Sequence, residues 1–209
     1  EFSKIDVKDR DLLTGLREFF KSLLTSGQVD ALLVPWRLPM NQGIMPTLIT
    51  RPEDMDQADP LAPCFPLNAA RLASRLTKRP SGKTVGLVMR PCEIRAFIEL
   101  IKLKQGSRDQ VVLVGMDCLG AFNNADFARY ARSGEPTRPF YESVLDGSGK
   151  DPAGFETASA CRVCEHPVPA NCDIAIGLYG VEYGSRILVE TPTPRGKAVI
   201  QALKLADCE

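Results

Sequence analysis

The order of hydrophobic and polar residues predicts a helix near the start of the chain. Between residues 9 and 26, apolar side chains recur at the three- and four-residue spacing of one helix face. These side chains are Leu12, Leu13, Leu16, Phe19, Phe20, Leu23 and Leu24. Gly27 follows them and suits the end of a helix.

Further along, short apolar runs alternate with helical patterns. The predicted strands cover 29–35, 45–50, 84–89, 110–118, 173–180 and 186–193, and the predicted helices cover 67–77, 91–105 and 195–207. Pro35 is expected to end the first strand, and the loop 36–43 to follow it. The proline-rich segment 51–66 shows no regular pattern. The strand–helix–strand unit between 84 and 118 implies parallel strands and a right-handed crossover.

The pattern weakens between residues 119 and 160. A helix is expected within 124–134 and a loop over 145–155. The fold class predicted from these elements is α/β, with a mostly parallel sheet, flanking helices and a long irregular insertion that carries a C-x-x-C loop. We expect one domain spanning 1–209, either complete or part of a longer subunit, since the chain does not begin with Met.

Composition excludes several functional classes. The 26 basic residues equal the 26 acidic residues, so no net charge draws the chain to nucleic acid or to an anionic membrane. No apolar run approaches the roughly 18 residues that a membrane span requires. The charged start lacks the apolar core of a signal peptide. We therefore expect a cytoplasmic protein with reduced thiols.

The seven cysteines carry the candidate chemistry, and three lie in the stretch SACRVCEHPVPANCDI. Cys161 and Cys164 form a C-x-x-C pair, a spacing that presents two thiolates to one metal centre or closes a disulfide. Cys92 and Cys118 each follow a predicted strand. In a parallel sheet both would lie at the carboxyl edge, where open α/β sheets bind ligands. A position in the first turn of a helix also favours the Cys92 thiolate.

Four thiolates suit either a [4Fe–4S] cluster or a structural zinc ion. A redox dithiol at the C-x-x-C pair and unrelated core cysteines remain alternatives. Cys64, Cys172 and Cys208 are expected not to ligate, and His166 is expected to be a loop residue, although it could complete a zinc site. The chain has no G-x-S-x-G, H-E-x-x-H or P-loop motif, so no catalytic residue is predicted.

The cysteine segments resemble the coenzyme F420 hydrogenase/dehydrogenase beta-subunit family, which includes subunits of F420-reducing hydrogenase and of certain formate dehydrogenases. The similar stretches are GLVMRPCEIRAFIEL, VLVGMDCLG, CRVC and CDIAIGLYG. They match the family at Pro91-Cys92-Glu93, at Cys118, at Cys161 with Cys164, and at Asp173-Ile174 with Gly177. The similarity extends more weakly to LLTSGQVDALLVP and GSRILVETPTPRGKAVIQAL.

This resemblance implies an iron–sulfur flavoprotein subunit of an oxidoreductase complex. Cys92, Cys118, Cys161 and Cys164 would hold a [4Fe–4S] cluster that exchanges electrons with FAD. The flavin would exchange hydride with a deazaflavin (coenzyme F420) or a nicotinamide coenzyme, and other subunits would supply further clusters. Candidate flavin contacts near the same edge are Asn68, Arg71, Arg90 and Arg95. The alternative is a zinc-stabilised interaction module without enzymatic activity, built on Cys161, Cys164 and further Cys or His ligands.

Overall fold

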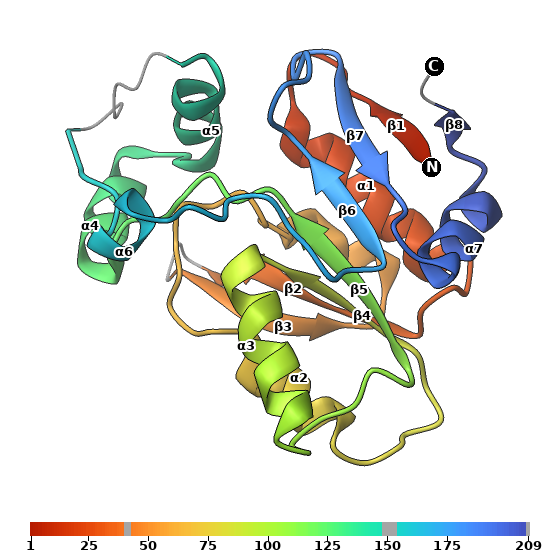
Figure 1. Ribbon diagram of the computed structural model, residues 1–209. Helices are drawn as coiled ribbons and strands as arrows, with labels where there is room; N and C mark the ends of the chain where they lie inside the picture. Colours follow the sequence, from red (N-terminus) through yellow and green to blue (C-terminus); the bar gives the residue numbers. More distant parts are fainter. Residues whose placement is uncertain (40–42, 148–153, 208–209) are drawn as a thin grey trace.

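The structure, a computed structural model, describes residues 1–39, 43–147 and 154–207. In this part of the chain the strands form one eight-stranded sheet in the order β3-β2-β4-β5-β6-β7-β1-β8 (Figure 1). The strands are β1 (Phe2–Asp6), β2 (Ala31–Arg37), β3 (Ile44–Ile49), β4 (Val85–Met89), β5 (Val111–Met116), β6 (Ile174–Gly177), β7 (Arg186–Glu190) and β8 (Ala206–Asp207).

Parallel pairing is confined to the centre of the sheet. β2, β4, β5 and β6 run parallel, whereas β3 at one side and β7, β1 and β8 at the other pair antiparallel. The α/β class is therefore confirmed. The expectation that Pro35 ends its strand is wrong, because β2 continues to Arg37. Pro35 faces Pro46 across the antiparallel β2–β3 ladder and lies beyond the three residues that pair with β4.

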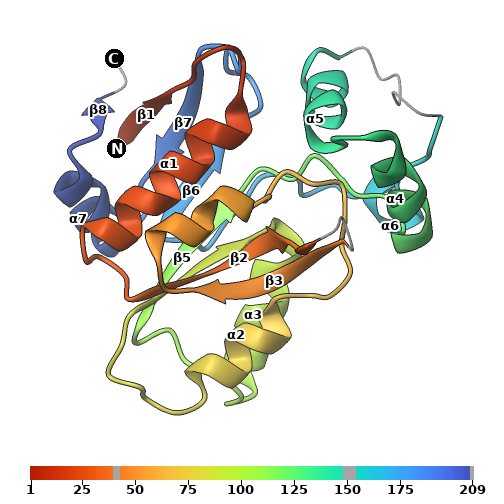
Figure 2. The same ribbon diagram turned by 180° about the vertical axis from the view of Figure 1, so that it is seen from behind.

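Helices cover both faces of the sheet. The helices are α1 (Leu12–Thr25), α2 (Ala70–Thr77), α3 (Pro91–Lys102), α4 (Asn124–Tyr130), α5 (Thr137–Leu145), α6 (Ser159–Arg162) and α7 (Pro194–Leu203), with 3-10 turns η2 (Pro52–Gln57) and η3 (Ala131–Ser133). Figure 1 shows α2 and α3 on the near face, and Figure 2 shows α1 on the opposite face. No helix among these is long and apolar enough to cross a membrane in the described ranges.

The predicted first helix is confirmed as α1. Its N-cap Asp11 accepts a hydrogen bond from the backbone N–H of Thr14 at 3.0 Å, which satisfies a donor that the helix leaves free. The apolar face packs on the sheet with Leu16 and Phe20 fully buried. Gly27 follows the helix end with a φ of 71°, in the left-handed region that glycine adopts readily. Local periodicity and capping together account for this helix.

Several short elements were not predicted. β1 pairs with β7, and β8 pairs with β1 at the edge of the sheet. β1 buries Ser3 and Ile5 at alternate positions. Only five residues long, β1 lacks the apolar content that marks the central strands. The segment 51–66 contains η2, anchored by the fully buried Met55. In each case long-range contacts, which a local pattern does not reveal, stabilise the element.

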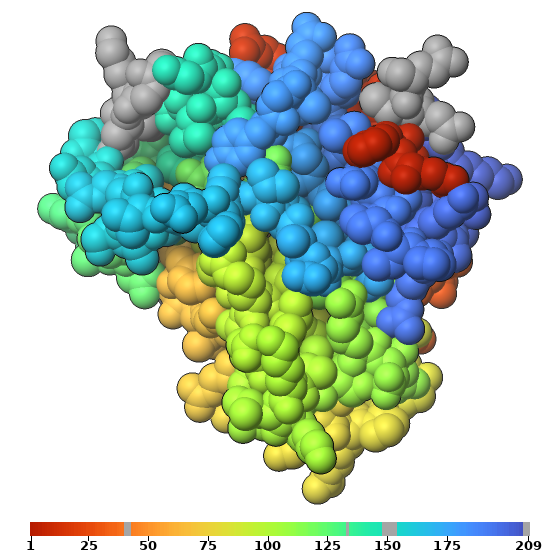
Figure 3. All heavy atoms as spheres, viewed as in Figure 1, coloured from red at the N-terminus to blue at the C-terminus, as the bar shows by residue number. Residues whose placement is uncertain are grey.

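The insertion between β5 and β6 spans 117–173 and is more regular than expected. It contains the predicted helix α4, the unpredicted α5, and the single turn α6. These helices lie together at one end of the molecule (Figures 1 and 2), and the segment from α6 to β6 runs across the surface past α3 (Figure 3). An apolar cluster that includes Phe122, Phe127 and Phe140 joins the insertion to Ile44 and Ala62.

Candidate metal and cofactor site

Cys92 lies in the first turn of α3, directly beyond the carboxyl end of β4. The residue before the helix is Arg90, whose backbone is extended and whose N–H donates to Glu93 Oε2 at 3.0 Å. Pro91 occupies the first helical position, where its missing N–H is not needed. The other Glu93 oxygen accepts from the N–H of Ala69 at 2.8 Å. These contacts fix the turn that presents Cys92 at the sheet edge.

Cys118 follows β5 by two residues, and backbone hydrogen bonds bring the C-x-x-C loop beside it. The Cys118 N–H donates to the carbonyl of Pro167 at 2.8 Å, and the Ala158 N–H donates to the carbonyl of Ala121 at 2.8 Å. Gly120 lies in the same turn and has a φ of 97°, a backbone conformation that glycine adopts without strain.

All four predicted cysteine ligands line one cavity of about 940 Å³ at the carboxyl edge of the sheet. Cys92 and Cys164 are exposed, while Cys118 and Cys161 are half-buried. The cavity wall also contains Phe65 and Tyr179. The structure thus brings together cysteines from three separate segments of the chain. Among the described residues, however, no three His, Cys, Asp or Glu side chains form a group that could hold a single metal ion.

Two of the four thiols have a raised pKa. The pKa of Cys92 is raised to about 11 by desolvation, the largest cause, together with Glu93 and Cys118, while two arginines act in the opposite direction. Burial likewise raises the pKa of Cys118, and the neighbouring Cys161 and Cys164 contribute in the same direction. Without a cation Cys92 and Cys118 therefore remain protonated near neutral pH, and a bound metal would have to displace their protons.

The other cysteines are placed differently. Cys172 is 1% exposed and belongs to the core between the sheet and α3, and Cys64 is buried in the cluster beneath the insertion. These positions agree with the expectation that neither ligates. Cys208 lies outside the described residues. His166 is exposed and lies in a loop, as expected, and this loop forms part of the cavity wall.

Three of the four candidate flavin contacts line the same cavity. These are Asn68, Arg90 and Arg95; Arg71 is exposed on α2 and is not part of the wall. The Asn68 side-chain oxygen accepts from the N–H of Ala70 at 2.9 Å, so this residue also shapes the start of α2. Arg90 is buried and Arg95 is exposed.

Two buried aspartates that were not predicted as site residues hold the two ends of β6, and only Asp117 lies at the carboxyl edge that carries the cavity. Asp117, next to Cys118, accepts the N–H groups of Leu178 and Tyr179 at 2.8 and 3.0 Å, and thereby joins the ends of β5 and β6. Burial raises its pKa, and these two hydrogen bonds oppose that effect. Asp173 accepts from Leu113 N–H at 2.9 Å and from Thr193 Oγ1 at 2.8 Å. The sequence signal that could have identified both residues is an aspartate directly next to an apolar strand.

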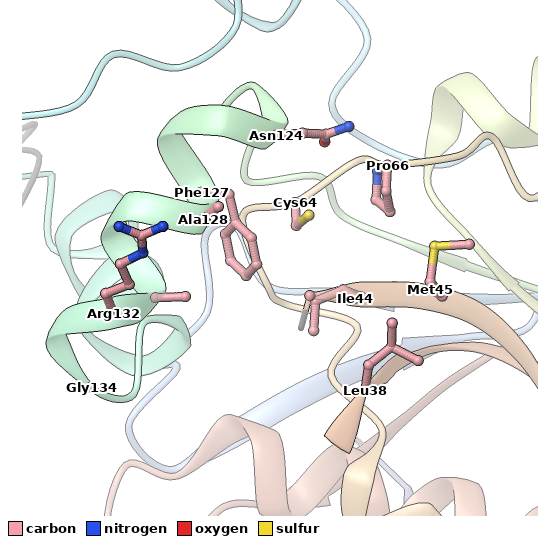
Figure 4. Close-up of a pocket in the computed structure, with 12 residues that line it drawn as sticks. Leu38, Ile44, Met45, Cys64, Pro66, Asn124, Phe127, Ala128, Arg132 and Gly134 are labelled. Carbon is pink, nitrogen blue, oxygen red and sulfur yellow. The ribbon is translucent and has the colours of Figure 1, made fainter. Parts of the chain in front are cut away.

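A second cavity of about 580 Å³ adjoins the first and shares Asn124 with it. Figure 4 shows Ile44 and Met45 from β3, Cys64 and the α4 residue Phe127 around this space. The segment 64–68 separates the two cavities, since Cys64 lines one and Phe65 lines the other. The sequence gave no indication of this second cavity.

Fold and site together define an α/β protein whose central parallel strands present a four-cysteine cavity. No protein-family model matches the chain. The chain is 25% identical over 201 residues to the F420-dependent formate dehydrogenase subunit beta of Methanocaldococcus jannaschii, covering 87% of this chain and 52% of the relative. It is 24% identical over 204 residues to the F420-dependent formate dehydrogenase 1 subunit beta of Methanococcus maripaludis, with the same coverage.

Among solved structures, the F420-reducing [NiFe] hydrogenase complex from Methanosarcina barkeri contains a chain of the same fold. The TM-score is 0.63 at 16% identity, over 96% of this chain and 77% of that chain. The chain is similar in sequence to beta subunits of F420-dependent formate dehydrogenases, as the resemblance predicted. It spans about half the length of these curated relatives.

Proposed function

We propose that the chain is an electron-transfer subunit of an oxidoreductase complex, holding a [4Fe–4S] cluster and FAD in the four-cysteine cavity. Cys92, Cys118, Cys161 and Cys164 would hold the cluster. Other subunits of a hydrogenase- or formate dehydrogenase-type assembly would be its partners. Bound there, the flavin would exchange hydride with coenzyme F420 or a nicotinamide coenzyme, and single electrons with the cluster.

One observation carries this proposal: cysteines from three distant segments line one cavity at the ligand-binding edge of the sheet. Inert core cysteines are usually buried among apolar side chains, as Cys172 is. The four candidate ligands are instead exposed or half-buried. The homology to beta subunits of F420-dependent formate dehydrogenases independently supports a redox role.

The donor set fits a [4Fe–4S] cluster. Such a cluster takes four cysteine thiolates, each on a different iron. All four candidate cysteines line one cavity, so the chain can supply the full set from this wall.

The cavity also suits a flavin. Its volume of about 940 Å³ lies at the upper end of ordinary ligand pockets. Phe65 and Tyr179 offer aromatic surfaces, while Asn68 and Arg95 offer polar groups for a ring or a phosphate. The adjoining cavity around Phe127 provides room for a second redox coenzyme (Figure 4).

The chain's own residues would position the ligands and limit access of water. Tyr179 donates its hydroxyl to the Cys118 carbonyl at 2.9 Å, and Asp117 ties the same turn to β6. Burial raises the pKa of Tyr179 to about 12, with Cys118 and Asp117 adding to the effect, so the phenol stays a neutral donor. These contacts hold Cys118 in place before any ligand binds.

The proposal is tested by purifying the protein without oxygen and measuring iron, sulfide, zinc and flavin. We expect about four irons and four sulfides per chain, a brown colour that dithionite bleaches, and bound FAD. Serine substitutions at Cys92, Cys118, Cys161 and Cys164 should each reduce the iron content strongly. The matched control Cys172→Ala should keep it.

A colourless protein that binds one zinc ion through Cys161 and Cys164 would reject the proposal. That result would favour the alternative, a zinc-stabilised interaction module. A protein with the cluster and no flavin would reject the flavin part alone. Loss of iron in Cys172→Ala to the same extent as in Cys92→Ser would show that the ligands are wrongly assigned.

A further inference from the structure

Arg90 is a buried cation in the wall of the four-cysteine cavity. It lies between the end of β4 and Cys92, and only 9% of its surface is exposed. Fully charged side chains are rarely buried to this extent unless an opposite charge compensates them. Arg95, one turn further along α3, lines the same cavity but is exposed to solvent.

Neutral groups hold the Arg90 side chain in place. Its Nη2 donates to the carbonyl oxygen of Ala62 at 2.8 Å, and its guanidinium carbon lies 5.4 Å from the centre of the Phe65 ring. Both contacts orient a cation, and the ring face also attracts it. Neither contact brings a negative charge.

No acidic side chain in the described ranges forms an ion pair with Arg90; the ion pairs there use other basic residues. The nearby Glu93 interacts with its charge, but the two carboxylate oxygens accept the N–H groups of Ala69 and of Arg90 itself. A buried cation without an ion-pair partner is costly. An anion within the cavity would compensate it.

The four thiols lie in the same cavity as this charge. Arg90 lies two residues before Cys92 and lines the cavity together with Cys118, Cys161 and Cys164. Ligation of iron would convert these thiols to thiolates and place net negative charge in the cavity. The Arg90 guanidinium is then the buried positive charge beside it.

We propose that Arg90 sets the reduction potential of the [4Fe–4S] cluster through its fixed, buried positive charge. This inference rests on the proposed function. Reduction transfers one electron, from the flavin or another donor, to the cluster and makes it more negative. A fixed cation stabilises the reduced state more than the oxidised state and therefore raises the potential.

The experiment compares Arg90→Gln and Arg90→Lys with the full-length wild-type chain, all purified without oxygen. Iron and flavin contents are measured first, and the midpoint potential of the cluster is then titrated with mediator dyes and followed by electron paramagnetic resonance. Arg90→Gln should lower the equilibrium constant for one-electron reduction at least about tenfold, which corresponds to about 59 mV. Arg90→Lys keeps the charge and should stay within about threefold of wild type.

Two controls separate burial from charge. Arg95→Gln removes an exposed cation from the same cavity, and because water screens that charge, the shift should be clearly smaller than for Arg90→Gln. Arg75→Gln removes an exposed cation on α2 that does not line the cavity, and the potential should not move.

The outcomes distinguish this inference from the proposed function. Wild-type protein without a cluster would overturn both. A full cluster with an unchanged potential in Arg90→Gln would overturn the role of Arg90 alone. If Arg90→Gln also lost FAD while the potential stayed unchanged, the inference would be overturned as well, because Arg90 would then serve the flavin. If Arg90→Gln fails to hold the cluster, a wild-type potential in Arg90→Lys supports the inference, and loss of the cluster there overturns it.

Discussion

Asp59 anchors the cysteine-bearing insertion to the sheet, and removing its carboxylate should destabilise both. Its side chain is fully buried and forms an ion pair with Arg37, which ends β2. It also accepts a hydrogen bond from the hydroxyl of Thr137, the first residue of α5, at 2.7 Å. Asp59 therefore connects the sheet to the insertion through two side chains.

The structure sets the magnitude of the effect. Asp59→Ala leaves the Arg37 guanidinium, whose side chain is only 18% exposed, without its buried partner. Breaking a buried ion pair in this way costs about 3–5 kcal/mol. Arg37 keeps a second ion pair with Glu135 at 3.0 Å, so we expect a loss near about 3 kcal/mol in the free energy of unfolding. Thr137→Val leaves the ion pair and removes the hydrogen bond to Asp59 together with a longer one, at 3.4 Å, that the hydroxyl accepts from Arg37, and it should cost about 1.5 kcal/mol.

Urea unfolding measures these losses, and hydrogen exchange locates them. Amides of α5 and of the 154–167 segment should lose protection in Asp59→Ala more than those of β4 and β5. The double variant Arg37→Met with Asp59→Leu removes both charges and should be more stable than Asp59→Ala, because no unpaired charge stays buried. A loss below about 1 kcal/mol in Asp59→Ala, or a double variant as unstable as the single one, would refute this reasoning.

Two further predictions concern single positions. Burial raises the pKa of Asp11, but the Thr14 hydrogen bonds and nearby arginines outweigh it, so the net pKa is lowered. Its stabilising contribution is thus complete above the unfolded pKa of about 3.9 and is lost as the pH falls further. In urea unfolding, Asp11→Ala should lower the free energy of unfolding by about 1 kcal/mol at pH 7 and by less at pH 3. Asp11→Asn can still cap the helix, so its loss at pH 7 should be much smaller. In Gly196→Ala the new methyl would overlap the backbone carbonyl of Asp173, so the free energy of unfolding should fall by about 3 kcal/mol or more. The β-carbon of Gly177→Ala would lie 3.4 Å from its nearest neighbour, so that variant should lose far less. Equal losses in the two variants, measured by urea unfolding, would contradict the close approach at Gly196.

Local sequence pattern was sufficient for the centre of the fold. The apolar stripe of α1 appears where its helical periodicity placed it, and β4 and β5 appear where continuous apolar runs placed them, since central parallel strands are buried on both faces. β1 and α5 were missed for the opposite reason. β1 gains its stability from pairing with β7, and α5 from contacts such as that between the Tyr141 hydroxyl and the carbonyl of Arg10 at 3.1 Å.

The candidate site divides in the same way. Cys92 and Cys118 could be placed at one edge from the strands alone, because the carboxyl ends of parallel neighbours lie side by side. Nothing local placed the C-x-x-C loop there. The bonds from Cys118 to Pro167 and from Ala158 to Ala121 hold it, and these join backbone groups, which leave little trace in side-chain identity. A motif of two cysteines therefore indicates a pair of thiols without revealing which residues lie beside it. The position of that pair depends on how the insertion is anchored to the sheet.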